Sequence, residues 1–100
     1  MKSGYKVKWT DNAIAELRVT FEYLEENWSE KEMRSLSVEI DRIVNLISIH
    51  PTMFPKSEKG DIRGAVVKTL NTLYYREKGE NSIEILSFFS NRQNPDKRKV

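Results

Sequence analysis

Two amphipathic helical segments that follow each other almost without a break constrain this fold more than any other feature. In the first segment apolar residues recur at steps of three and four, so they line one stripe of a helix: Ile14, Leu17, Phe21, Leu24 and Trp28. The second segment repeats this spacing: Met33, Leu36, Ile40, Ile43 and Ile47. Ser29 and Glu32 between them have the spacing of a capping box, so a second helix restarts directly after the first. A link this short predicts an antiparallel helical hairpin.

Strand-like runs stand on both sides of the hairpin. Residues 5–9 alternate apolar and polar, which is typical of a strand with one buried face. After His50 and Pro51 comes a loop that we expect Phe54 to pin, and then three further runs at residues 62–67, 70–77 and 82–89. The short turn at residues 78–81 contains Gly79, which can adopt a positive φ. The predicted order is therefore β-α-α-β-β-β.

This order predicts an α+β fold with two layers. Short links between the strands favour an antiparallel, mostly meander, four-stranded sheet. The helical hairpin covers the one apolar face that such a sheet must bury. The chain has 100 residues, the length of one domain, so we expect residues 1–100 to form a single unit. Residues from about 91 to 100 are expected to be a polar, basic C-terminal tail.

Composition excludes several kinds of chemistry. The chain has no cysteine and one histidine, His50, so disulfides, thiolate or histidine metal sites and a Ser-His-Asp triad are excluded within it. We therefore expect no metal and no small-molecule cofactor. The apolar runs are too short to span a membrane, and the first residues contain no apolar segment of the kind found in signal peptides. A cytoplasmic location is the expectation.

Charge is unevenly distributed along the chain. Residues 10–50 hold four basic and nine acidic residues, a net charge of −5, and the overall charge of +2 leaves +7 for the remainder. Such asymmetry is compatible with an anionic partner such as nucleic acid or an acidic peptide. The alternative is a solvated acidic helix face together with a frayed basic tail, which is common in stable domains.

Basic residues at the strand ends are the best site candidates. Arg63 begins the second strand-like run, and Lys68 lies in the turn after it. Arg76 follows Leu73-Tyr74-Tyr75 in the third run, and Arg92 follows the last run. Alternation places Tyr74 on the same face as Arg76. If the guanidinium groups of these arginines converge on that face of the sheet, they would bind phosphates or carboxylates. The alternative is a set of surface salt bridges to the nearby acidic residues Asp61, Glu77, Glu80 and Glu84.

These features together resemble a known family. The opening Val7-Lys8-Trp9-Thr10 with Ala13 and Leu17, the middle pieces Ile62-Arg63 and Val66-Val67, and the close Leu73-Tyr74-Tyr75-Arg76, Ile83-Glu84-Ile85-Leu86 and Asn91-Arg92-Gln93-Asn94-Pro95 resemble the RelE/ParE toxin superfamily of type II toxin–antitoxin systems. The resemblance covers nearly the whole chain. It implies a toxin that a cognate antitoxin holds silent, usually through a C-terminal segment that wraps the toxin and partly extends its sheet.

The superfamily has two known activities, and the residues at the functional positions distinguish between them. RelE-like members cut messenger RNA on the ribosome, whereas ParE-like members poison DNA gyrase. Of the RelE functional positions, Arg63 and Arg92 keep a basic group, while Ala65, Thr72 and Arg98 stand where another basic residue, an arginine and a tyrosine are expected. The nuclease set is therefore incomplete, which favours the ParE-like branch. That match is also incomplete, because many ParE-like chains carry an arginine where Thr72 stands.

We therefore expect a ParE-like toxin whose target is the gyrase–DNA complex. The candidate surface, which contains no assigned catalytic residue, consists of Arg63, Lys68, Arg76, Asn91 and Arg92. One alternative is a metal-independent, ribosome-dependent endoribonuclease that uses the same basic residues. The other is an inactive homologue that acts only by binding its antitoxin.

Overall fold

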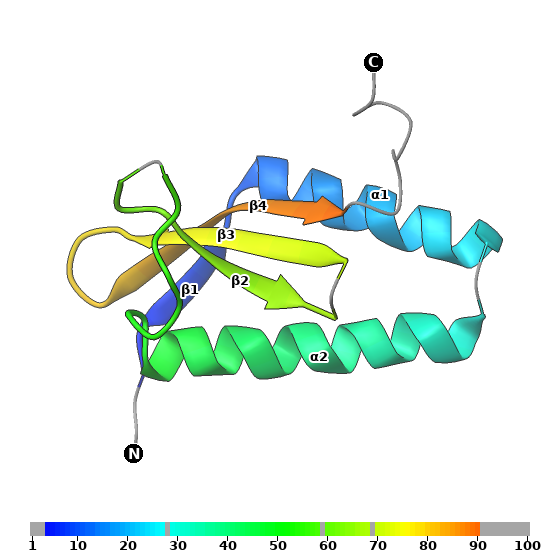
Figure 1. Ribbon diagram of the computed structural model, residues 1–100, viewed down its shortest axis with the longest axis horizontal. Coiled ribbons are helices and arrows are strands. Elements are labelled where there is room, and N and C mark those ends of the chain that lie inside the picture. Colours follow the sequence, from blue (N-terminus) through cyan, green and yellow to red (C-terminus); the bar gives the residue numbers. More distant parts are fainter. Residues whose placement is uncertain (1–3, 28, 59, 69, 91–100) are drawn as a thin grey trace.

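The chain folds as two helices on one side of a four-stranded sheet (Figure 1). The computed structural model describes residues 4–27, 29–58, 60–68 and 70–90. Its elements are β1 (Lys6–Trp9), α1 (Asp11–Asn27), α2 (Glu30–Ile49), β2 (Arg63–Val67), β3 (Asn71–Glu77) and β4 (Ser82–Ser90). The predicted element order and the two-layer α+β class are confirmed. Trp28 and the predicted tail at 91–100 lie outside the described residues.

Both helices begin where the sequence places capping side chains. The Thr10 hydroxyl accepts a hydrogen bond from the backbone N–H of Ala13 at 3.2 Å, at the start of α1. The Ser29 hydroxyl accepts one from the N–H of Glu32, also at 3.2 Å, at the start of α2. These bonds satisfy amides that the first helical turn leaves unpaired. The second helix can therefore begin after a very short link, and the two helices of the hairpin run antiparallel (Figure 1).

The sheet is mixed rather than purely antiparallel. Its strand order is β1-β4-β3-β2, and the last three strands form the predicted antiparallel meander. β1, however, lies parallel to β4, with Lys6 opposite Ser82 and Trp9 opposite Ile85. The predicted antiparallel direction is wrong at this strand. Short links determine only the directions of neighbouring strands, and β1 is separated from β4 by the whole hairpin, so nothing local specifies its direction.

Polar side chains of α1 attach that helix to the edge of β4. The β3–β4 register shifts between Tyr74 and Tyr75, which pair with Ser87 and Ile85, so Leu86 is an extra residue. Such a bulge leaves backbone groups without a strand partner. Here Glu16 of α1 accepts hydrogen bonds from the Ser87 hydroxyl at 2.6 Å and from the Phe88 N–H at 2.9 Å. Beyond the end of β1, α1 thus supplies hydrogen-bond acceptors to β4 in place of a neighbouring strand.

This attachment sets which face of α1 is buried. The apolar spacing predicts Ile14 in the buried stripe, but Ile14 is 41% exposed. Ala13, Thr20 and Leu24 are the fully buried residues of α1. The prediction for Ile14 is wrong because the polar contacts with β4 rotate the helix away from the face that apolar residues alone would choose. In α2, which has no such contacts with β4, the predicted Leu36, Ile40, Ile43 and Ile47 are all buried.

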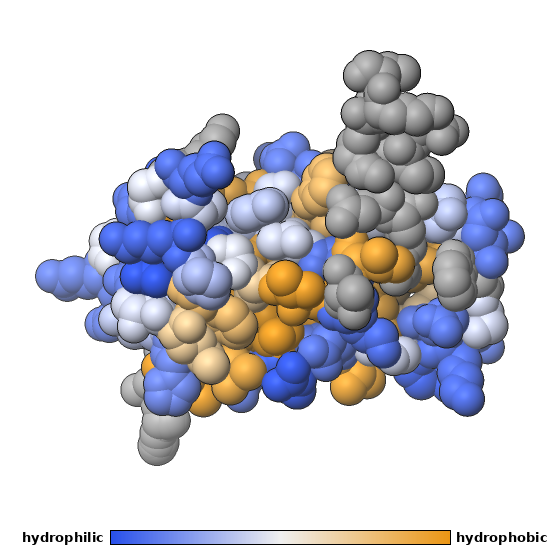
Figure 2. Space-filling view, in the orientation of Figure 1, coloured by the Kyte–Doolittle hydropathy of each residue, from blue (hydrophilic) through white to orange (hydrophobic). Residues whose placement is uncertain are grey.

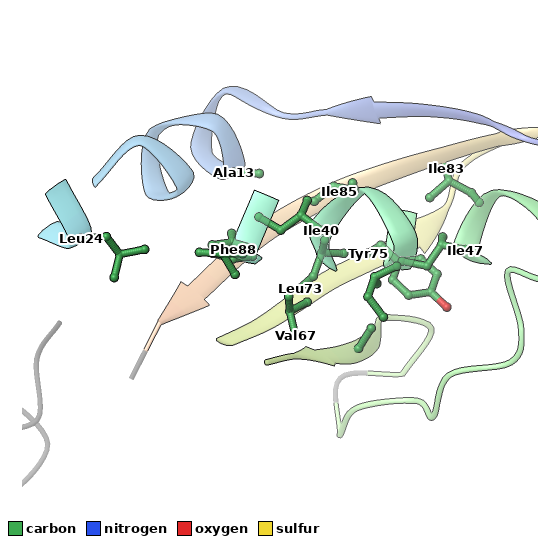
Figure 3. Close-up of a cluster of buried hydrophobic side chains, with 13 residues drawn as sticks. Ala13, Leu24, Ile40, Ile47, Val67, Leu73, Tyr75, Ile83, Ile85 and Phe88 are labelled. Carbon is green, nitrogen blue, oxygen red and sulfur yellow. The ribbon is translucent and has the colours of Figure 1, made fainter. Parts of the chain in front are cut away.

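The core fills the space between the helices and the inner face of the sheet. Ile40 and Ile47 of α2 extend toward Leu73 and Tyr75 of β3 (Figure 3). The buried cluster comprises Ala13, Leu24, Leu36, Ile40, Ile43, Ile47, Ala65, Val67, Leu73, Tyr75, Ile83, Ile85 and Phe88. Among the described residues, no helix is long and apolar enough to cross a membrane. Among the described residues the helices cover only one face of the sheet, so the other face is the place to look for a functional surface.

Truncation of Ile40, which is 6% exposed, should be costly. We expect Ile40→Ala to lower the free energy of unfolding by about 2–5 kcal/mol, since it leaves a cavity between α2 and the sheet. Val38 on the same helix is 63% exposed, so Val38→Ala is the matched control and should change it by less than about 0.5 kcal/mol. Urea unfolding followed by circular dichroism measures both values. Equal values for the two variants would contradict the assigned core.

Candidate functional site

The face of the sheet opposite the helices, here called the open face, is the candidate site. Along β3 the residues Leu73 and Tyr75 are buried against the helices, so alternation turns Tyr74 and Arg76 to the open face. This confirms that Tyr74 and Arg76 share a face. Strand register then defines three rows across the open face: Val66, Thr72 and Phe89; Gly64, Tyr74 and Ser87; and Lys8, Glu84 and Arg76.

One end of the open face is apolar. Val66 is 60% exposed and Phe89 is 36% exposed, with Thr72 between them in register. Leu70, in the turn that joins β2 to β3, is 38% exposed. Figure 2 shows apolar side chains gathered over β2 and the adjoining ends of β3 and β4. A group of exposed apolar side chains such as this is a typical contact surface for another protein.

A cleft occupies the middle of the open face. Its volume is about 540 Å³, and it is lined by Ser57, Glu58, Ile62, Tyr74, Leu86 and Ser87. A Cβ atom added at Gly64 would lie 3.2 Å from the Tyr74 ring, so the absence of a side chain at Gly64 lets this ring pack across β2. Of the aromatic residues of these strands, Tyr75 and Phe88 are buried in the core, whereas Tyr74 and Phe89 belong to the open face.

The other end of the open face is charged. Arg76 approaches Glu84 Oε1 through Nε at 3.1 Å and Nη2 at 3.0 Å, and Lys78 Nζ lies 3.4 Å from Glu84 Oε2. The hydrogen bond from Arg76 is the main cause that lowers the pKa of Glu84 below its ordinary value, and Lys78 adds to it. Lys8 stands beside Glu84 in register on β1. Arg76 therefore forms one of the surface salt bridges that were the alternative to a phosphate site.

Arg63 binds the loop between α2 and β2. Its Nη1 donates a hydrogen bond to the Phe54 carbonyl at 2.7 Å. The Phe54 ring meets Tyr75 edge-on at 6.4 Å, and the Tyr75 hydroxyl donates to the Pro51 carbonyl at 2.7 Å. Phe54 thus pins this loop as expected. Since Arg63 is in register with Tyr75 rather than Tyr74, it belongs to the opposite side of the sheet from Arg76.

Of the remaining candidates, the structure describes only Lys68. Lys68, in the β2–β3 turn with φ +52°, donates from Nζ to the Ser35 hydroxyl of α2 at 2.7 Å. Asn91 and Arg92 lie outside the described residues. The last described residue, Ser90, pairs with Asn71, and Asn71 is about 17 Å along β3 from Arg76. The structure therefore does not bring Arg63, Lys68 and Arg76 together.

Sequence reasoning missed several charged residues of the open face. Lys6 and Lys8 alternate with the half-buried Val7 and Trp9, so the same strand pattern that predicted β1 also placed both lysines on one face. What the pattern could not supply was the neighbour of β1. Only the parallel pairing with β4 puts Lys8 beside Glu84 and thus joins β1 to the charged end of the open face.

Comparison with known proteins gives a consistent result. Residues 7–95 match the family model described as "ParE toxin of type II toxin-antitoxin system, parDE". Among curated proteins no significant match is found. A solved structure titled "Chromosomal ParDE TA system from P. aeruginosa" has a chain that is similar with a TM-score of 0.72 and 19% sequence identity, over 86% of this chain and 95% of that one. At this identity the structural likeness shows the shared fold.

The Glu84 carboxyl offers a pH test of the charged end. Because its pKa is lowered in the folded protein, its ion pairs stabilise the fold above its ordinary pKa, and the stabilisation is lost as pH falls through the folded value. Arg76→Gln should move the pKa of Glu84 back toward the ordinary glutamate value. NMR titration of side-chain carboxyl signals measures it, with Arg34→Gln on α2 as control. An unchanged Glu84 titration in Arg76→Gln would contradict the assigned contact.

Proposed function

The chain belongs to the ParE toxin family of type II toxin–antitoxin systems, and we propose that it inhibits DNA gyrase in the cytoplasm and is neutralised by a cognate antitoxin. The proposal is one of binding rather than catalysis. Its target is the gyrase–DNA complex, and its contact surface is the open face with Arg76, together with Asn91 and Arg92, which follow β4 in the sequence.

One observation carries the choice of binding over catalysis: the candidate basic residues are dispersed. Arg63 is bound to the Phe54 carbonyl, Lys68 to Ser35 and Arg76 to Glu84, at three separate places in the fold. Cleavage of RNA by its own 2′-hydroxyl requires groups that converge on one phosphate and stabilise its developing charge. Among the described residues these three do not converge, which supports a toxin that acts by occupying a surface of its target.

The apolar end of the open face supports an antitoxin partner. Protein interfaces depend on a few apolar or aromatic anchors that become fully desolvated. Val66 and Phe89 present such side chains to solvent, next to the turn residue Leu70. A segment that is disordered alone and folds on binding can cover a surface of this kind. The similar ParDE structure is, by its title, that of a toxin–antitoxin system.

Expression of the chain without an antitoxin tests the proposed target. We expect growth arrest with double-strand DNA breaks, and loss of supercoiling by purified gyrase when the purified protein is added. Codon-positioned cuts in translating messenger RNA, with intact DNA, would instead establish the RelE-like nuclease. Normal growth with a folded, abundant protein would establish an inactive homologue.

A further inference from the structure

We propose that the charged end of the open face binds the phosphate backbone of duplex DNA through Lys6, Lys8, Arg76 and Lys78. The inference deepens the proposed function, on which it rests, because it assigns the DNA of the gyrase–DNA complex to a definite part of the toxin. These four residues are here called the basic patch. Three of them, Lys6, Lys8 and Lys78, are absent from the candidates that the sequence suggested.

The basic patch is held in position by the sheet. Lys6 and Lys8 are both exposed on β1, and two residues of a strand separate them by about 6.6 Å. Lys8, Glu84 and Arg76 lie in one row across β1, β4 and β3, and neighbouring strands are about 4.8 Å apart. Lys78 joins the row through its contact with Glu84. The array therefore measures roughly 7 by 10 Å, and duplex DNA carries one charge per about 1.7 Å of its axis.

Only one carboxylate lies within the rows of the basic patch. Glu84 contacts both Arg76 and Lys78, and its side chain is 19% exposed. Because a guanidinium carries five N–H donors, a contact through Nε and Nη2 leaves Nη1 of Arg76 for a further acceptor. Asp11 lines the same hollow as the three lysines of the basic patch, so four cations and two carboxylates give this end a local charge of about +2. Glu84 thus orients Arg76, and its negative charge lowers the net charge of the basic patch by one.

Nine of the 15 acidic residues belong to the helices, which form the opposite layer. The exposed carboxylates of the helices include Glu22, Glu25, Glu26, Glu30 and Asp41, and the helices cover the inner face of the sheet. Among the described residues the two helices carry a net charge of −5 and the strands and loops carry +2, so this part of the asymmetry lies between the two layers. A polyanion is repelled by the helical side and attracted by the basic patch, so the field orients the toxin as it approaches DNA.

The composition of the patch favours DNA over an acidic protein segment. Protein interfaces use apolar anchors, and the exposed large apolar residues of the described open face, Val66 and Phe89, lie in the row farthest from Lys8 and Arg76. The end of the molecule with the β3–β4 turn is hydrophilic (Figure 2). Phosphate binding requires only placed cations and is independent of sequence. The two ends of the open face thus suit two different partners.

Salt dependence of DNA binding tests the proposal directly. We expect the full chain, without gyrase, to bind duplexes of unrelated sequence equally, with a slope of log affinity against log salt near −3, for about three phosphate contacts. Lys6→Gln with Lys8→Gln should lower the slope by roughly two units and weaken binding at 0.1 M salt by about tenfold or more. Fluorescence anisotropy of a labelled duplex measures these quantities.

Two further variants separate the patch from overall charge. Lys31→Gln with Arg34→Gln removes the same two charges from exposed positions of α2 and should leave the slope unchanged. Glu84→Gln removes the carboxylate from the patch and should tighten binding, the opposite direction. Circular dichroism confirms that each variant is folded. Equal losses in the two double variants, or wild-type affinity in Lys6→Gln with Lys8→Gln, would overturn the proposal.

The outcomes also separate this inference from the proposed function. Tighter binding of an RNA duplex or of a poly-glutamate peptide than of DNA would overturn the inference and assign the patch to that partner. Gyrase inhibition that is unaffected by the patch variants, together with no DNA binding, would overturn it and leave the proposed function standing. Patch-dependent DNA binding without gyrase inhibition would confirm the inference and overturn the proposed target.

Discussion

The parallel pairing of β1 with β4 is the constraint on which the rest of the structure depends. It joins the first strand of the chain to the last and makes β4 an interior strand, with Val7 opposite Ile83 and Trp9 opposite Ile85. α1 begins directly after this pairing, and the Thr10 hydroxyl donates to the Ile85 carbonyl at 2.9 Å. Glu16 then binds the bulge of β4. The direction of β1 therefore decides where the hairpin lies and which face of the sheet stays open.

This arrangement of strands gives the open face an apolar end and a charged end. The meander of β2, β3 and β4 alone would produce the apolar row of Val66, Thr72 and Phe89. The basic patch needs β1 as well, because Lys6 and Lys8 reach Glu84 and Arg76 only when β1 lies beside β4. One face thus offers apolar anchors for a protein partner at one end and cations for phosphates at the other, while the helices keep most of the acidic groups on the far side.

Sequence reasoning succeeded where the governing interactions are local. The helices follow from apolar spacing and the caps at Thr10 and Ser29, and the strand faces follow from alternation, as Tyr74 and Arg76 show. It failed where contacts join distant segments. The direction of β1, the bulge at Leu86 and the exposure of Ile14 all depend on how α1 and β1 meet β4. For the same reason the dispersal of Arg63, Lys68 and Arg76 could not be read from their spacing.

The proposed target contacts the open face rather than the helical hairpin. Lysine footprinting tests this directly: amines of the toxin are acetylated in its complex with gyrase and DNA, and mass spectrometry reports each site. Lys6, Lys8 and Lys78 should be protected relative to the free toxin, whereas Lys31 on α2 should remain reactive. Protection of Lys31 with full reactivity of Lys6 and Lys8 would contradict the account.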